Sequence, residues 1–185
     1  MKRRRFALDI RPGAVALLAG LYFLLPLRWC VRLALAVVVH ELGHVAALWS
    51  FGGRVRGVSL ELGGLHLDAR LPAEGWKEAL CSLAGPAAGL LWSAVAAWMG
   101  GERWLYVSGL SALLSLFNLL PCLPLDGGRA LLAATGSETL LRWGGLVSVG
   151  LLLWTGFRWK LWFSLIPALW LLGQQFLLAW KSVSG

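Results

Sequence analysis

Charged side chains are scarce in this chain of 185 residues. Asp, Glu, Lys and Arg make up 14% of the sequence, whereas 58% is hydrophobic and the mean hydropathy is +0.71. A soluble domain of this length would carry more charge and spread it more evenly. Of the nine acidic residues, Glu41 lies inside a long apolar run and Asp126 at the end of another, and the rest lie in the N-terminal tail, in connecting segments or at the edge of a run. The composition therefore predicts a membrane protein.

Cysteine is also rare, and its spacing excludes two kinds of site. The three cysteines, Cys30, Cys81 and Cys122, are an odd number and form no C-x-x-C pair. Neither a disulfide framework nor a cysteine zinc site is therefore indicated. Cys122 precedes Asp126 by four residues and could approach a metal there, although a buried apolar cysteine is the more ordinary interpretation.

The apolar runs predict an all-α polytopic membrane protein with six transmembrane helices. Each run is near the 20 residues that cross a bilayer core, although the first is short. No cleavable signal peptide is evident, because basic residues rather than small ones follow the first run, which is expected to remain as a span. Tryptophans near the ends of several runs fit an interfacial aromatic belt. The predicted spans cover residues 13–27, 33–51, 77–99, 103–123, 139–157 and 161–180.

The distribution of Lys and Arg predicts how the chain is oriented. With the N-terminus in the cytoplasm, the inside segments hold twelve of these residues and the outside segments hold five. Both termini are therefore expected on the cytoplasmic side of a cytoplasmic-type cell membrane. This orientation, together with contact with the lipid bilayer and its anionic lipids, accounts for the net charge of +8, so no nucleic-acid partner is inferred.

The connection after the second span is predicted to form a membrane-associated β-hairpin at residues 52–70. Hydrophobic and polar residues alternate from Val55 to Leu62 and again from Leu65 to Arg70, on either side of Gly63-Gly64. Such alternation around a Gly-Gly turn is typical of a hairpin. An open strand edge there could pair with an extended substrate. The alternative is a hairpin that only covers the site or lies in the membrane interface.

Histidines are few, three in all, yet two of them lie four residues apart in the second predicted span. His40, Glu41 and His44 form an H-E-x-x-H motif. On a helix, residues four apart share one face, so both imidazoles can bind one zinc ion, Zn2+, while Glu41 acts as general base toward a water molecule. Ionisable groups are costly in hydrocarbon, and three within five residues indicate a functional site.

A catalytic zinc site usually has a third protein ligand, and two candidates are available. His66 lies in the predicted hairpin, where a solvated histidine is the ordinary expectation. Asp126 follows a segment interrupted by prolines and precedes two glycines, so the helix is expected to break there. Broken backbone at membrane depth occurs where it is buried in protein or lines a watery cavity. In the predicted orientation His44 and Asp126 both fall in the cytoplasmic half, which favours Asp126 as the third ligand.

Three motifs, in this order, resemble those of the site-2 protease family of intramembrane metalloproteases. They are H-E-x-x-H at residues 40–44, Ala84-Gly85-Pro86, and Asn-x-x-Pro-x-x-Pro-x-Asp-Gly at residues 118–127. The resemblance implies a single metalloprotease domain over residues 1–185, with its core motifs within 33–130. The layout is most similar to the stage IV sporulation protein FB branch, which cleaves a membrane-tethered sigma-factor precursor. That branch usually continues into a CBS domain, for which this sequence has no room, and a PDZ-like insert is also missing.

The resemblance implies that the chain hydrolyses a peptide bond in or near a membrane-embedded segment of a membrane-tethered protein. The cut would lie close to the cytoplasmic face and could release a transcription or sigma factor. Asn118 would hydrogen-bond the substrate backbone or the oxyanion, or instead tie helices together. A membrane inhibitor or regulatory protein is a further expected partner. Two alternatives stay open, namely a catalytically silent relative that binds membrane helices and a zinc transporter, which would need ligands along several spans.

Overall fold

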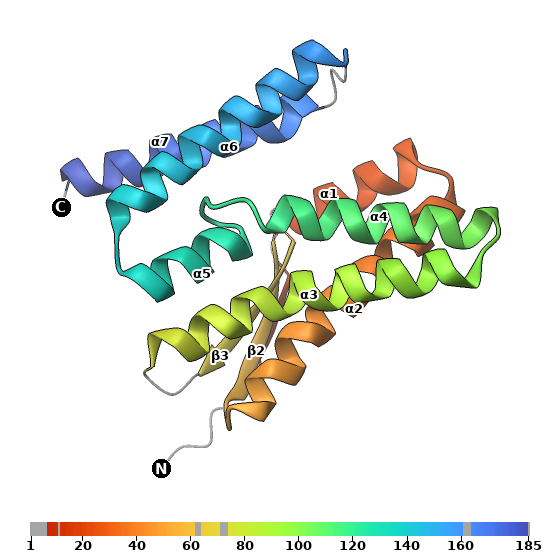
Figure 1. The fold of residues 1–185 in the computed structure, drawn as a ribbon, viewed down its shortest axis with the longest axis horizontal. Coiled ribbons are helices and arrows are strands. Elements are labelled where there is room, and N and C mark those ends of the chain that lie inside the picture. The colour runs from red at the N-terminus through yellow and green to blue at the C-terminus, as the bar shows by residue number, and fades with distance from the viewer. Residues whose placement is uncertain (1–6, 11, 62–63, 71–73, 161–163, 185) are drawn as a thin grey trace.

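The described part of the chain is mainly helical, with one small sheet (Figure 1). The computed structural model describes residues 7–10, 12–61, 64–70, 74–160 and 164–184. The elements in chain order are β1 (Ala7–Ile10), α1 (Pro12–Leu24), α2 (Leu27–Ser50), β2 (Arg54–Glu61), β3 (Gly64–Arg70), α3 (Gly75–Met99), α4 (Glu102–Asn118), α5 (Asp126–Thr135), α6 (Glu138–Arg158) and α7 (Leu165–Ser184).

Within the part of the chain that the structure describes, three helices, α2, α3 and α6, are long and apolar enough to cross a membrane. Six spans were predicted, and a helix does lie at each position, but α1, α4 and the described apolar part of α7 are shorter, so six crossings are not established. Large apolar side chains on the helix surfaces are exposed, with Phe23 at 83%, Trp98 at 87% and Phe157 at 82%. Such extensive apolar exposure is a property of membrane or protein contact surfaces.

Helix α3 lies at the centre of the bundle and packs against α2, α4 and α5. Small residues allow these backbones to approach closely, as is common for membrane helices. A Cβ atom on Gly43 of α2 would lie 2.5 Å from the Ala84 carbonyl oxygen and 2.6 Å from the Ala88 Cβ atom of α3. On the other side of α3, the Ser93 hydroxyl donates a hydrogen bond to the Ser108 carbonyl of α4 at 2.9 Å. The bundle therefore holds α2 and α4 in fixed positions on α3.

The sheet has the strand order β1-β2-β3, with β1 parallel to β2 and β2 antiparallel to β3. Strands β2 and β3 lie where sequence alternation predicted a hairpin, and Val58 pairs with Leu67. Residues 62–63 between them lie outside the described residues. Strand β1 was not predicted, because four residues are too few to show a period. Among the described strands, β3 has no neighbour on its outer edge.

The chain between α4 and α5 turns sharply and sets the start of α5. Helix α4 ends at Asn118, although the predicted span continued to residue 123. The two prolines of this segment have no backbone N–H and disfavour helical conformation at the residues before them. Gly127 and Gly128 lie directly against the backbone of residues 119–123, where Cβ atoms would overlap it. The loop therefore folds back on the first turn of α5, and Asp126 is the first residue of that helix.

Helices α6 and α7 pack together, and both contact the loop between α4 and α5 (Figure 1). A buried apolar cluster joins Cys122 and Leu125 of the loop to Val149 of α6 and Leu171 of α7. This cluster fixes the loop that leads into Asp126.

Candidate metal centre

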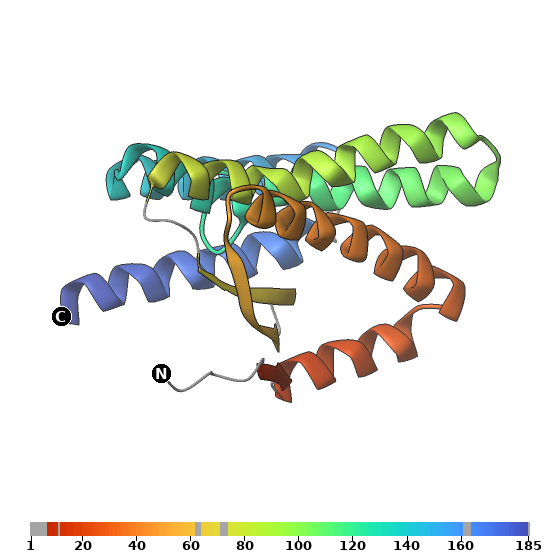
Figure 2. The same cartoon turned by 90° about the horizontal axis from the view of Figure 1, so that it is seen from below.

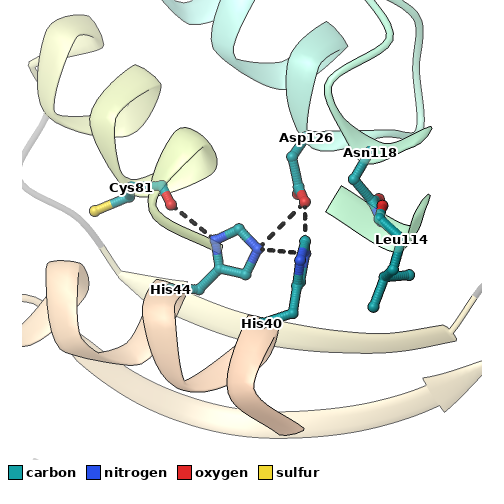
Figure 3. A network of polar contacts seen from close by, with 6 residues as sticks. All are labelled: His40, His44, Cys81, Leu114, Asn118 and Asp126. Atoms are coloured by element: carbon teal, nitrogen blue, oxygen red, sulfur yellow. Dashed lines mark hydrogen bonds and ion pairs between the residues drawn. The ribbon is translucent and has the colours of Figure 1, made fainter. Parts of the chain in front are cut away.

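Three side chains from two distant helices meet at the centre of the bundle. His40 and His44 lie one turn apart on α2, and Asp126 begins α5. The Asp126 Oδ2 atom lies 3.0 Å from His40 Nε2 and 3.3 Å from His44 Nε2, and the two Nε2 atoms are 3.3 Å apart (Figure 3). Among the described residues, these three form the group of potential metal ligands.

The triangle of donor atoms fits a zinc ion. Zinc binds imidazole nitrogen and carboxylate oxygen at about 2.0–2.2 Å in tetrahedral geometry, so two of its ligand atoms are about 3.3–3.5 Å apart. The three observed separations are close to that range. His40 and Asp126 are only 4% and 8% exposed, and a buried carboxylate is normally paired with a positive group or bound to a metal ion. A set of two histidines and a carboxylate also leaves one tetrahedral position for water or substrate.

Helix α3 orients one of the two histidines. The His44 Nδ1 atom donates a hydrogen bond to the Cys81 carbonyl at 2.8 Å, which leaves the Nε2 lone pair for a metal (Figure 3). Gly85, one turn further along α3, lies against the same ring, and a Cβ atom there would overlap His44 Nε2. The glycine of the Ala84-Gly85-Pro86 motif therefore provides the space for this imidazole, a role that the sequence alone did not reveal.

The charge state of Asp126 suits a metal ligand. Zinc binds a carboxylate in its ionised form. Ionisation of this buried carboxyl group is favoured by the two imidazoles whose Nε2 atoms lie within 3.3 Å of its Oδ2 atom.

Glu41 is half-buried beside the donor triangle. It interacts electrostatically with His44, His40, Asp126 and Arg129. Arg129 follows Asp126 by three residues on α5, so the two share one face of that helix. Arg129 was not predicted to lie here, because its position follows from the packing of α5 on the bundle. A general base beside a metal needs this proximity, and the role of Glu41 as that base stays a prediction.

The other predicted residues have different positions. Asn118, the last residue of α4, lies beside the centre, and its Nδ2 atom donates to the Leu114 carbonyl at 2.9 Å (Figure 3). Its contact with a substrate stays a prediction. The side chain of His66 lies outside the described residues. Cys122 is fully buried in the apolar cluster and is not part of the group of potential ligands.

A bundle with membrane-length helices that buries a His, His, Asp donor set defines a candidate metalloprotein of the membrane. The fold has a known counterpart in the site-2 protease from Methanocaldococcus jannaschii. That structure matches with a TM-score of 0.63 at 21% identity, over 92% of this chain and 89% of the other.

Two sequence relatives of the chain are named zinc metalloproteases. The chain is 34% identical over 122 residues to the putative zinc metalloprotease of Synechocystis sp., which covers 60% of this chain and 32% of that protein. It is 34% identical over 113 residues to a zinc metalloprotease of Methanocaldococcus jannaschii, over 56% of this chain and 33% of that protein. The chain thus spans about a third of the length of the curated relatives it matches. No family profile matches the chain.

Proposed function

We propose that the chain is an intramembrane zinc metalloprotease of the site-2 protease family, which hydrolyses a peptide bond in a membrane-tethered protein. The observation that carries the proposal is the donor triangle of His40, His44 and Asp126, in which both histidines, like Glu41 beside them, lie on α2, a helix long enough to cross a membrane. The zinc metalloprotease relatives and the site-2 protease fold support it.

The residues of the centre have distinct roles in this reaction. Zinc, held by His40, His44 and Asp126, would polarise the scissile carbonyl and lower the pKa of a water molecule. Glu41 accepts the proton of the attacking water and passes it to the leaving amine. The Cys81 carbonyl keeps the His44 ring in the tautomer that presents Nε2. Asn118 hydrogen-bonds the substrate backbone or the oxyanion once its amide turns from the Leu114 carbonyl.

The position of the centre along α2 suggests where the substrate is cut. His44 lies six residues before the end of α2 at Ser50, which is about 9 Å along a helix axis. With both termini in the cytoplasm, that end of α2 faces the cytoplasm, and the scissile bond lies near the same face. Released products would include cytoplasmic domains, of which a transcription or sigma factor, as in the stage IV sporulation protein FB branch, is one candidate. A membrane inhibitor or regulatory protein would control access.

The free edge of β3 is the element we propose for substrate recognition. A helical substrate hides its peptide bonds in i→i−4 hydrogen bonds, so a segment must unwind before cleavage. Pairing of the unwound segment with β3 would replace some of the lost hydrogen bonds.

Glu41→Gln tests the proposal. The full chain is co-expressed with membrane-tethered candidate substrates, and cleavage is followed by immunoblot. We expect the wild type to cut at least one substrate and Glu41→Gln to lose at least about 100-fold in rate, because an amide cannot accept the proton of water. Zinc content should not change, since Glu41 is not a ligand. Cleavage by Glu41→Gln at the wild-type rate would contradict the assignment of the base.

A further inference from the structure

The first two turns of α2 and of α4 together carry an arginine–aromatic cluster, formed by Arg28, Trp29 and Arg32 of α2 and Tyr106 of α4. The guanidinium carbon of Arg32 lies 5.0 Å from the centroid of the Trp29 ring and 4.9 Å from that of Tyr106. The two rings meet edge to face with centroids 4.8 Å apart. Arg32 is therefore held in one place by two cation–π contacts, whereas an ordinary surface arginine is mobile.

The cluster has an excess of positive charge. Glu102, in the first turn of α4, is its acidic neighbour and accepts a hydrogen bond from the Tyr106 hydroxyl at 2.9 Å. Arg28 is exposed and Arg32 half-buried, and neither forms an ion pair with a carboxylate of the described residues. Arg103, also exposed, follows Glu102 directly. The first two turns of α2 and α4 thus carry three guanidinium groups, those of Arg28, Arg32 and Arg103, and one carboxylate, that of Glu102.

The location of the cluster is at the end of membrane-length helices. Helix α2 begins here, and the turn between α3 and α4 lies at the same end of the bundle, as Figures 1 and 2 both show. Trp98, near the end of α3, is 87% exposed. Tryptophan and tyrosine are enriched at the depth of lipid headgroups. Helix α2 was predicted to start only at residue 33, so the sequence left Arg28 and Arg32 in a connecting segment.

We infer that the arginine–aromatic cluster binds the phosphate of an anionic phospholipid headgroup. Both rings lie on the same side of Arg32, because their centroids are 4.8 Å apart and each is about 5 Å from the guanidinium carbon, so N–H groups on the other side stay available for phosphate oxygens. Arg28 precedes Arg32 by four residues on α2 and supplies a second guanidinium on the same helix face. Exposed apolar side chains next to these residues in α2 and α4, namely Leu27, Val31 and Leu105, match acyl chains, which favours a lipid over a soluble anion or an acidic protein.

The test is native mass spectrometry of the full chain in mild detergent, titrated with phosphatidylglycerol or phosphatidylcholine. We expect phosphatidylglycerol to bind more tightly, and Arg28→Gln and Arg32→Gln each to weaken its binding about fivefold. Arg158→Gln is the matched control, because Arg158 is an exposed arginine at the end of α6 beside another tryptophan pair. Equal phosphatidylglycerol affinity in the double variant Arg28→Gln/Arg32→Gln and the wild type would overturn the inference. Equal affinity of the wild type for phosphatidylglycerol and phosphatidylcholine would also overturn it.

Two further experiments distinguish lipid binding by the cluster from an effect of misfolding and from binding of a free anion. Tyr106→Phe keeps the ring and should bind the lipid normally, whereas Tyr106→Leu removes one of the two rings that hold Arg32 and should weaken binding, with unchanged circular dichroism in both. Unchanged binding by Tyr106→Leu would overturn the role of stacking. Displacement of the lipid by inorganic phosphate at equal concentration would overturn the choice of a lipid. None of these measurements uses proteolysis, so the outcome is independent of the proposed function.

Discussion

Asp126 completes the metal centre from a helix that lies 86 residues away from His40 in sequence. Asp126→Ala removes one of three ligand atoms, and we expect it to lower zinc affinity by at least about 100-fold and to abolish cleavage. Zinc content of the purified protein, measured by inductively coupled plasma mass spectrometry, checks this. His66→Ala is the comparison, because His66 is the rival third ligand. Loss of zinc from His66→Ala with retention in Asp126→Ala would reverse the assignment.

Gly85 tests whether the space beside His44 matters. Gly85→Ala should lower zinc affinity by at least about tenfold, because the added methyl group overlaps the His44 ring and must displace it. Alanine is a better helix former than glycine by about 1 kcal/mol, so the substitution should not destabilise α3, and unfolding of α3 would not explain a loss of zinc. Gly109→Ala on α4 is the matched control, since nothing lies within 4 Å of a Cβ atom there. Equal zinc affinity in both variants would show that His44 does not need this space.

The sequence identified some of these residues and not others for a physical reason. His40 and His44 are local in sequence, so the helical period alone places them together, and the proline-broken segment marks Asp126. Gly85 and Arg129 act through contacts between helices, and such contacts leave no periodic pattern in either segment. A glycine in an apolar span indicates close packing but does not say what it packs against.

At the scale of elements, the position of most helices followed from hydropathy, whereas their ends did not. Helix α2 begins six residues before the predicted start, at Leu27 directly after Pro26, because arginine is a good helix former although it lowers the hydropathy from which the start was predicted. Helix α5 has ten residues and is too short to show as a span. Strand β1 pairs with β2 through backbone groups, which any sequence could provide.

The outer edge of β3 gives a prediction at this scale. Proline at alternate positions of residues 65–68 removes N–H groups that face either β2 or the free edge. If an extended substrate pairs with this edge, the proline substitutions that remove N–H groups facing it should slow cleavage several-fold without loss of zinc. Alanine at the same positions keeps the N–H group and is the control. The measurements are the cleavage rate of a membrane-tethered substrate and the zinc content of each variant. If all four proline variants cleave at the wild-type rate, substrate recognition at this edge is excluded.

At the scale of the whole molecule, the arrangement of helices and the predicted orientation together fix where cleavage should occur. The donor triangle is about 9–15 Å from the C-terminal end of α2, and the arginine–aromatic cluster lies at its other end. If that C-terminal end faces the cytoplasm, the reacting groups lie in the cytoplasmic half of the bilayer. Water is scarce in hydrocarbon, so a centre in this half is closer to its supply of water.

Cleavage should therefore occur within, or just beside, the cytoplasmic end of a substrate's membrane segment, and local unwinding should limit its rate. Replacing an alanine near the scissile bond by glycine destabilises the helix by about 1 kcal/mol, so we expect cleavage up to about fivefold faster. A run of strongly helix-forming residues at the same place should slow it. The product terminus, mapped by mass spectrometry, gives the position, with Glu41→Gln as the control for other proteases. A terminus on the outer side of the bilayer would contradict this orientation, even if zinc content and the dependence on Glu41 were as expected.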